Sequence, residues 1–319
     1  MKKRSDGLRQ QAHETTDQMG MSDSTEHKFE LPPEQQAIRA KCFHPSGTFV
    51  EFPIEEVEQS IPERFEKIVR IYPDRVAVKV RDQFLTYDQL NVAANRIARA
   101  ILALPGTAEQ PIALLFEHDA PMITAILGVL KAGRVYVPID LSFPKERVGY
   151  MIEDSQVGMI VTDTRNHPFA REFANERVRL INIDALDSNC SSENLRLALA
   201  PQTLAFIVYT SGSTGHPKGV IHNHQNILYS VFVETNSFHI SSEDRLGLIH
   251  TFSSSASVKF LFGSLLNGAS LFPFNARKQT LAHLAIWLIQ VAIWLIQEKI
   301  SICDFVTAIP HFYSQSFRY

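Results

Sequence analysis

The sequence predicts an α/β fold with largely parallel sheets that carry helices on both faces. Short apolar runs alternate with amphipathic segments through most of the 319 residues. Many of these runs are apolar at successive positions, which is typical of strands buried on both faces of a parallel sheet. The 45% hydrophobic and 20% charged fractions are those of an ordinary globular protein. This composition also excludes a coiled coil, a collagen-like chain and a fully disordered one.

The first predicted elements are a short strand pair and a helix with a clear N-terminal signal. The apolar runs Val76–Val80 and Phe84–Leu85 predict the two strands. The helix over 87–104 begins with a capping box, because Thr86 precedes Gln89 by three residues. The same alternation then predicts strands at 112–116, 135–138, 159–162 and 178–183, a helix over 121–131 that ends at Gly133, and a helix over 144–154 that opens at Ser142.

The alternation continues beyond a loop rich in Ser and Asn at 188–194. Because such composition marks loops, we expect a subdomain boundary near 188–202. The polar N-terminal stretch lacks periodicity, so residues 1–45 are predicted to be a disordered leader before a folded core over 46–319. The later predicted elements are strands at 204–209, 246–249, 270–274 and 301–307 and helices after Asn223 and near 258–266.

Charge and cysteine usage narrow the classes of function. The net charge of -3 gives no basic footprint for nucleic acid. The basic start has no apolar stretch behind it, so it does not fit a secretory signal. Three scattered cysteines without a CxxC pair argue against a disulfide framework and a zinc site. We therefore expect a cytoplasmic protein without a metal site of its own and without nucleic acid or membrane partners.

One apolar segment, Leu281–Gln297, requires a membrane check. Its three polar residues recur every seven positions. The run is shorter than the roughly 20 residues that cross a bilayer, so a buried helix is predicted and a membrane span is the alternative. The segment also repeats itself, since AIWLIQ occurs at 285–290 and again at 292–297. A seven-residue duplication lengthens a helix by about 10 Å and turns its face by only about 20°.

Chemically active residue types concentrate in YTSGSTGHPKGV at 209–220, at the predicted end of a strand. Its hydroxyl groups, its glycines and its lysine offer hydrogen-bond donors and a positive charge, which suit a polyanion such as a triphosphate. The spacing differs from that of a Walker loop, because Lys218 stands three positions after Gly215. Composition alone also fits a linker, but the position directly after a strand favours a phosphate-binding loop.

The same residues carry a family resemblance. The string Ile207–Lys218 resembles the AMP-binding signature of the adenylate-forming enzymes, which include acyl-CoA synthetases, luciferases and the adenylation domains of nonribosomal peptide synthetases. LKAGRVYVPID at 130–140, IPERFEKIVRIYPDRVAVKV at 61–80 and LTYDQL at 85–90 resemble the peptide-synthetase branch in particular. The resemblance runs from about Phe52 to the last residue. It implies the N-terminal core of that fold, with two Rossmann-like subdomains.

The resemblance also implies ligands and the residues that bind them. ATP and Mg²⁺ would be the cofactors and a carboxylic acid the substrate. His224 matches a family histidine at the start of the next helix, and a satisfied histidine near the helix cap is an equal alternative. Lys131, Gly133 and Asp140 are interpreted as structural, at a helix terminus, its stop and a turn. The residues implied in holding the phosphates are Thr210, Ser211, Gly212, Ser213, Thr214, Gly215 and Lys218.

Two departures from the family pattern change these expectations. Where peptide synthetases carry Phe-Asp-x-Ser-Val, this chain has Ser254–Val258, so Ser255 replaces an aspartate that pairs with the substrate's α-ammonium group. A neutral hydroxyl cannot make that bond, which implies an acid without an α-amino group or a decayed pocket. The family's ribose-binding aspartate and catalytic lysine have no counterpart in the 319 residues. We therefore expect a truncated domain with no catalytic residue of its own, weak activity and poor solubility.

Three hypotheses fit these residues. The first is the N-terminal part of a ligase that activates a carboxylic acid as acyl-adenylate for transfer to a thiol. Its expected partners are a carrier protein with a phosphopantetheine thiol and a C-terminal domain encoded separately. The second is a non-catalytic nucleotide-binding remnant, which the heptad duplication and Ser255 favour. The third, an unrelated ATPase or kinase, lacks both Walker spacing and the kinase motifs.

Overall fold

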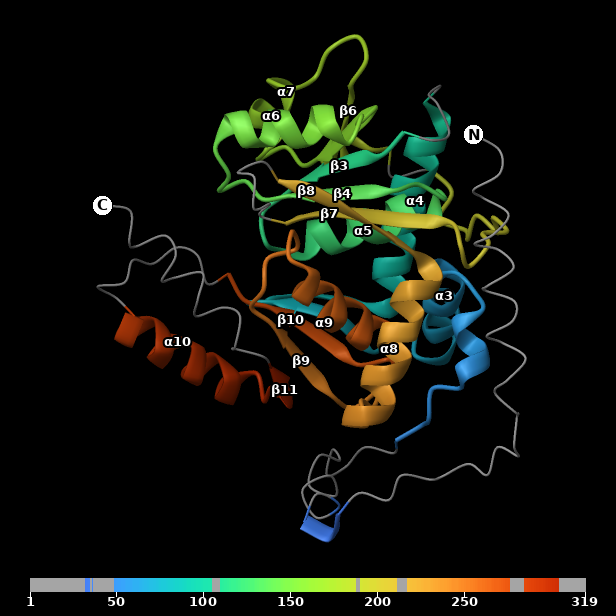
Figure 1. Ribbon diagram of the computed structural model, residues 1–319, viewed down its shortest axis with the longest axis vertical. Helices are drawn as coiled ribbons and strands as arrows, with labels where there is room; N and C mark the ends of the chain where they lie inside the picture. Colours follow the sequence, from blue (N-terminus) through green and yellow to red (C-terminus); the bar gives the residue numbers. More distant parts are fainter. Residues whose placement is uncertain are drawn as a thin grey trace, which may run out of the picture. The chain divides into compact units, whose positions relative to one another are not determined.

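The computed structural model describes residues 32–34, 36, 49–104, 110–187, 190–210, 217–275 and 284–303. The chain divides into two compact units, Met1–Lys41 and Cys42–Tyr319. In the first unit, the described residues 33, 34 and 36 are helical. The second unit contains two sheets with their helices (Figure 1), and the description below concerns this unit.

The six-stranded sheet has the strand order β6-β5-β3-β4-β7-β8. Its neighbouring strands pair in parallel, except that β7 and β8 pair antiparallel. Along β3, Ile112 and Leu114 join one buried cluster and Ala113 joins the other, so both faces of the sheet are covered. The strands are β3 (Ile112–Leu115), β4 (Tyr136–Ile139), β5 (Met159–Thr162), β6 (Arg179–Asn182), β7 (Leu204–Thr210) and β8 (Lys218–Asn223).

The five-stranded sheet has the strand order β11-β9-β10-β1-β2. Only the β1–β2 pair is antiparallel, as expected for the predicted strand pair near the start of the core. The chain enters this sheet first, crosses to the six-stranded sheet after β2 and returns after β8. The strands are β1 (Val76–Val80), β2 (Gln83–Thr86), β9 (Arg245–Leu248), β10 (Ser270–Pro273) and β11 (Ile302–Cys303).

Several helices begin at polar capping residues that the sequence supplies. The Thr86 hydroxyl accepts from the Gln89 amide, and the Gln89 side chain accepts from the Thr86 amide, which confirms the predicted capping box. Ser60 and Asn223 cap two further helices, and each side chain accepts from the backbone amide three residues later. The helices are α3 (Ile61–Ile71), α4 (Tyr87–Ala103), α5 (Ala120–Lys131), α6 (Lys145–Asp154), α7 (His167–Arg171), α8 (His224–Phe238), α9 (Ser255–Leu265) and α10 (Leu284–Gln297), with short 3-10 turns η1 (Ile54–Val57) and η2 (Ile183–Ala185).

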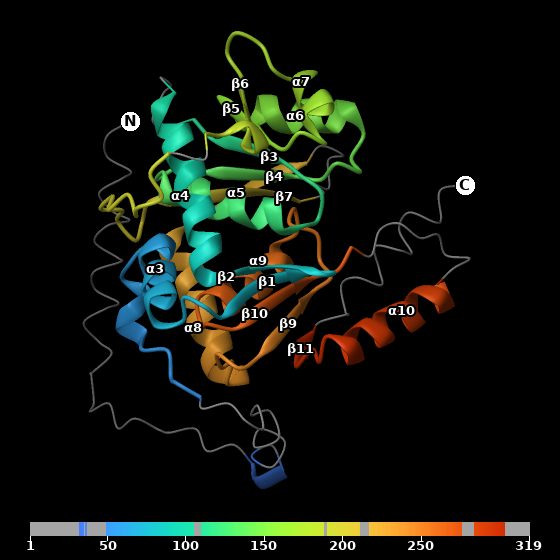
Figure 2. The same cartoon turned by 180° about the vertical axis from the view of Figure 1, so that it is seen from behind.

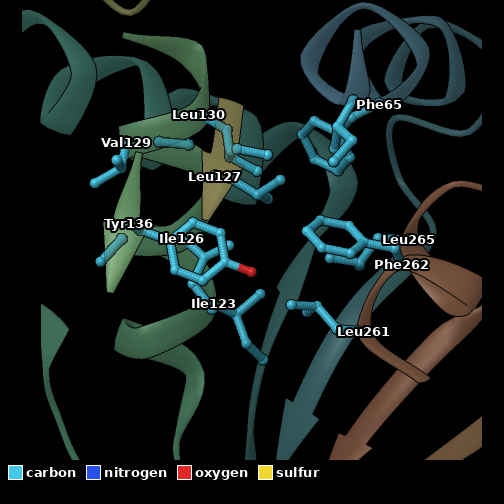
Figure 3. Close-up of a cluster of buried hydrophobic side chains, with 14 of the residues drawn as sticks. Phe65, Ile123, Ile126, Leu127, Val129, Leu130, Tyr136, Leu261, Phe262 and Leu265 are labelled. Carbon is cyan, nitrogen blue, oxygen red and sulfur yellow. The ribbon is translucent and has the colours of Figure 1, made fainter. Parts of the chain in front are cut away.

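Helices cover both faces of the six-stranded sheet, as the sequence predicts. On one face, α5 lies between the two sheets and contacts β3 and β4 on one side and β1 on the other (Figures 1 and 2). On the other face, α6 contributes Val148, Met151 and Ile152 to a separate buried cluster. The close-up in Figure 3 shows Ile123, Ile126 and other α5 side chains together with residues of α3, α9 and β4. The main core therefore joins the two sheets through α5.

The apolar helix α10 is only partly buried, which corrects the predicted buried helix. On one face, Val291 is 2% exposed and packs with Ile249, while Trp294 lies against this pair. On the other face, Ile289, Ile293 and Ile296 are 60%, 47% and 76% exposed. The reason is that α10 packs on Ile249 and Phe274, which directly follow β9 and β10, and no second layer is described on its other side. Within the described ranges, no helix combines the length and apolarity needed to cross a bilayer.

Three other details differ from the sequence expectations. Ser142 does not open α6; its hydroxyl donates to Asp140, and Pro144 is the N-cap instead. Helix α3 and strand β8 were not predicted, because both segments had been interpreted only as parts of longer motifs. The predicted strand at 301–307 is represented by β11, and its last four positions lie outside the described residues.

The predicted division into domains stays a prediction. Residues 190–203, within the stretch where a subdomain boundary is expected, connect β6 to β7. Both strands belong to the six-stranded sheet. The crossings between the two sheets occur near α4 and α8.

Candidate functional site

The candidate site lies where β7 ends and β8 begins. Thr210 is the last residue of β7, and Lys218, the first residue of β8, pairs with it across the antiparallel ladder. The Thr210 hydroxyl donates to the Lys218 carbonyl oxygen, with 3.4 Å between the two oxygens. Both residues are exposed. The remaining residues predicted to hold phosphate lie outside the described residues: Ser211, Gly212, Ser213, Thr214 and Gly215.

The residue types around the turn explain the close approach of its two strands. β7 is anchored by buried Phe206 and Val208. On β8, a methyl group at Gly219 would lie 2.9 Å from Ile207 Cγ2 and 3.3 Å from Tyr209 Cζ. These contacts are too short for a Cβ atom without movement of its neighbours, so this position requires glycine. The start of β8 is therefore held close against β7, directly after Lys218.

The charge at this turn suits an anion. Among the described carboxylates, none forms an ion pair with the Lys218 ammonium group. The turn follows the carboxyl end of β7, which is parallel to β4. In open α/β sheets, ligands bind outside the carboxyl ends of parallel strands. The described residues therefore fit a polyphosphate, because they offer an exposed cation at that edge.

His224 is buried at the start of α8. Its side chain is 1% exposed, and its Nδ1 accepts a hydrogen bond from the Ile61 amide at 3.4 Å. Burial lowers the pKa of His224 to about 4, so the ring is neutral near pH 7. In the described structure His224 thus satisfies an amide in the first turn of α3. A ligand role for this residue stays a prediction.

A cavity of about 270 Å³ opens beside the carboxyl ends of strands from both sheets. His118 lines it from the end of β3, and Thr251, Phe252 and Ser253 line it from the segment after β9. Ser255, the predicted substrate-pocket residue, is the exposed first residue of α9 and is not among the lining residues. Its role in selecting the acid stays a prediction. The lining residues of the cavity are Phe116, Glu117, His118, Met122, Ile139, Asp140, Leu141, Ser142, Ile249, Thr251, Phe252, Ser253 and Asn275.

Three residues of the upstream motif have structural contacts. Lys131 is buried at the end of α5 and forms an ion pair with Glu66, while burial lowers the pKa of Lys131. Gly133 adopts a positive φ of 66° just after the helix, which favours glycine. The Asp140 carboxylate accepts from the Ser142 amide at 2.9 Å and from its hydroxyl at 2.7 Å. These contacts agree with the interpretation of a helix terminus, its stop and a turn acid.

The structure adds a polar contact that the sequence analysis missed. The Tyr209 hydroxyl donates to Asp154 Oδ2 at 2.6 Å. Tyr209 precedes the last residue of β7, and Asp154 is the last residue of α6. The two residues are 55 positions apart, and no sequence pattern connects them. Only the packing of α6 on the six-stranded sheet brings them together.

A metal site formed by side chains alone is not found in this part of the chain. Across the described residues, no three His, Cys, Asp or Glu side chains gather closely enough to hold a metal ion.

Two mostly parallel sheets with a glycine- and hydroxyl-rich segment after a strand define an α/β protein with a candidate phosphate-binding turn. A family model described as AMP-binding enzyme matches residues 65–301. The chain therefore belongs to the AMP-binding enzyme family.

Relatives within this family include peptide synthetases. The chain is 36% identical to tyrocidine synthase 1 of Brevibacillus parabrevis over 228 residues, which cover 71% of this chain and 21% of that protein. It is 34% identical to surfactin synthase subunit 1 of Bacillus subtilis (strain 168) over 287 residues, which cover 90% of this chain and 8% of that protein. The chain thus spans about a fifth or less of the length of these curated relatives.

Solved structures confirm the fold class. The AMPPNP-bound form of the nonribosomal peptide synthetase FmoA3 matches with a TM-score of 0.63 and 26% identity, covering 76% of this chain and 25% of that one. The N-terminal subdomain of Klebsiella oxytoca NpsA matches with a TM-score of 0.68, covering 82% of this chain and 64% of that one. At 20% identity, the second likeness supports the fold alone.

Proposed function

We propose that this chain binds ATP at the β7–β8 turn and takes part in activating a carboxylic acid as an acyl-adenylate. The observation that carries the proposal is the signature Ile207–Lys218, whose described ends, Thr210 and Lys218, meet at the carboxyl end of β7. Membership of the AMP-binding family supports a nucleotide ligand. The AMPPNP-bound neighbour, at 26% identity, supports a triphosphate in particular.

The chain's own residues would act mainly by positioning the nucleotide and by offsetting the negative charge of its phosphates. The Lys218 ammonium group would offset phosphate charge, and the Thr210 hydroxyl would help to fix the turn. The residues Ser211–Gly215 would add hydroxyl and amide donors. When bound, ATP with Mg²⁺ would supply the α-phosphorus that a carboxylate attacks, with pyrophosphate as the leaving group. A thiol, such as that of a carrier protein, would then receive the acyl group and release AMP.

The proposed acid lacks an α-amino group. Ser255 stands where peptide synthetases carry the aspartate that pairs with an α-ammonium group. Ser255 is exposed at the start of α9, and its hydroxyl carries no charge that would favour a cation. A site that lacks this acceptor loses its preference for amino acids over other acids.

The test is an ATP–Mg²⁺ binding titration on the purified chain, followed by ATP–pyrophosphate exchange with amino, aryl and fatty acids. Lys218→Ala should weaken ATP binding by about tenfold or more, because a charge-assisted contact is lost. Lys259→Ala is the matched control, since Lys259 pairs with Glu234 on the surface. Exchange with acids that lack an amino group would support the whole proposal.

The other outcomes are equally informative. Exchange only with α-amino acids would contradict the proposed acid class. Binding without exchange, sensitive to Lys218→Ala, would support the alternative of a nucleotide-binding remnant. Equal ATP affinity in wild type and Lys218→Ala, or no binding at all, would overturn the proposed site.

A further inference from the structure

The last two residues of β7 face different surroundings. Thr210 is exposed at the turn, whereas Tyr209 is 7% exposed and belongs to the buried cluster on the α6 side of the six-stranded sheet. Burial and the hydrogen bond to Asp154 both raise the pKa of Tyr209, so its hydroxyl stays protonated and donates. One side chain thus links the end of β7 to the end of α6.

The ring of Tyr209 also contacts the other strand of the turn. Gly219 is its partner across the β7–β8 ladder. A methyl group at Gly219 would approach Tyr209 Cζ to 3.3 Å and its hydroxyl oxygen to 3.5 Å. The ring therefore lies directly against the backbone of Gly219. Because Gly219 follows Lys218 in the chain, the same ring limits where the Lys218 backbone can lie.

We propose that Tyr209 is a positioning residue that holds Thr210 and Lys218 in register for the anion at the β7–β8 turn. This inference rests on the function proposed above. The hydroxyl fixes β7 to Asp154 of α6, and the ring fixes β8 through Gly219. Both ends of the turn thereby depend on the rigid core behind the sheet, although neither Tyr209 nor Asp154 would touch the ligand.

The hydroxyl is the part of Tyr209 that packing alone does not require. A phenylalanine ring would fill the same space against Gly219. Asp154 has a second tyrosine nearby, since the Tyr150 hydroxyl lies 3.4 Å from its Oδ1. Tyr150 is on α6 itself, so its bond to Asp154 stays within one helix. The two hydroxyls share one carboxylate, but only that of Tyr209 connects it to the turn.

This arrangement supplies a matched pair of variants, Tyr209→Phe and Tyr150→Phe. The first measurement is amide hydrogen exchange of the full chain without nucleotide. Tyr209→Phe should speed exchange at Thr210, Lys218 and Gly219, and leave α5 unchanged. Tyr150→Phe should match wild type throughout. Gly219→Ala, which pushes the ring from its place, should reproduce the local change and serves as a second route should Tyr209→Phe not fold.

The second measurement is the affinity for ATP–Mg²⁺. Tyr209→Phe should weaken it by up to about tenfold, because Thr210 and Lys218 are then less well ordered before binding and the lost hydrogen bond sets the upper limit of that effect. Tyr150→Phe should not change it. A uniform rise in exchange across the six-stranded sheet and α5 would show a purely structural role and overturn the inference, as would equal exchange in both tyrosine variants.

Failure of the proposed function gives a different result from failure of this inference. If wild type binds no ATP, the proposed function fails, and the exchange data still decide whether Tyr209 holds Thr210 and Lys218. If wild type binds ATP and Tyr209→Phe binds it equally well with unchanged exchange, the positioning role is wrong while the ATP site stands.

Discussion

The helices α5 and α10 have similarly apolar sequences but different environments. Ala120–Lys131 buries every residue from Met122 to Lys131. Leu284–Gln297 is at least as apolar, yet three of its isoleucines are exposed. The difference shows that the hydropathy of a helix does not by itself predict how much of its surface is buried. The layer in which the helix lies must also be known. A helix between two sheets buries its whole circumference, whereas a helix on an outer face buries one side.

Packing partners account for the contrast. α5 lies against α4 on one side and contacts strands of both sheets. α10 packs on Ile249 and Phe274, which directly follow β9 and β10, and on Cys303 of β11. At its end, Glu298 pairs with Lys79 at 2.9 Å and with Arg245 at 3.4 Å. Partly exposed ion pairs of this kind contribute little to stability, so α10 depends mainly on its single buried face.

The largest expected effect is that of Leu127→Ala in α5. Leu127 is fully buried in the cluster of Figure 3. The substitution should lower the free energy of unfolding by about 2–5 kcal/mol, through lost burial and the cavity left behind. Urea denaturation followed by circular dichroism measures this change. Leu102→Ala in α4 is the matched control, because Leu102 is 41% exposed, and equal losses in the two variants would contradict the comparison.

A smaller but distinctive loss is expected from Gly128→Ala. A methyl group at Gly128 would lie 2.7 Å from Ile97 Cγ2 and 2.8 Å from Ile97 Cβ, so α4 and α5 would have to separate. The strain should destabilise the protein by about 1–3 kcal/mol, although alanine favours an isolated helix by about 1 kcal/mol. Thermal unfolding in parallel with wild type decides the sign. A gain in stability would mean that the two helices are not in close contact.

Much of the fold could be predicted from local signals, and the failures have physical causes. The Thr86–Gln89 capping box and the stop at Gly133 are local, so the sequence predicted both correctly. The exposure of α10 depends on which layers surround it, and this is not encoded in its own heptads. At the site, Thr210 and Lys218 were predicted to act together, and they pair across the ladder.

The contacts that support the site were beyond sequence reasoning. Tyr209 and Asp154 meet only because α6 packs behind β7. His224 satisfies the Ile61 amide, which lies 163 positions away in the chain. In both cases one polar group binds another that is distant in sequence, and residue type alone gives no information about such pairs. A tyrosine next to the end of a buried strand, before a polar turn, was the available hint.

The smallest expected effect is that of Ile296→Ala in α10, and it tests the outer half of the comparison. Ile296 is 76% exposed, so its side chain loses little contact with the protein when shortened. The free energy of unfolding should change by no more than about 0.5 kcal/mol. Val291→Ala on the opposite face should cost about 1.6 kcal/mol, because it removes two buried methyl groups. If Ile296→Ala proved as costly as Val291→Ala, a partner would have to cover the exposed face, and α10 would resemble α5 after all.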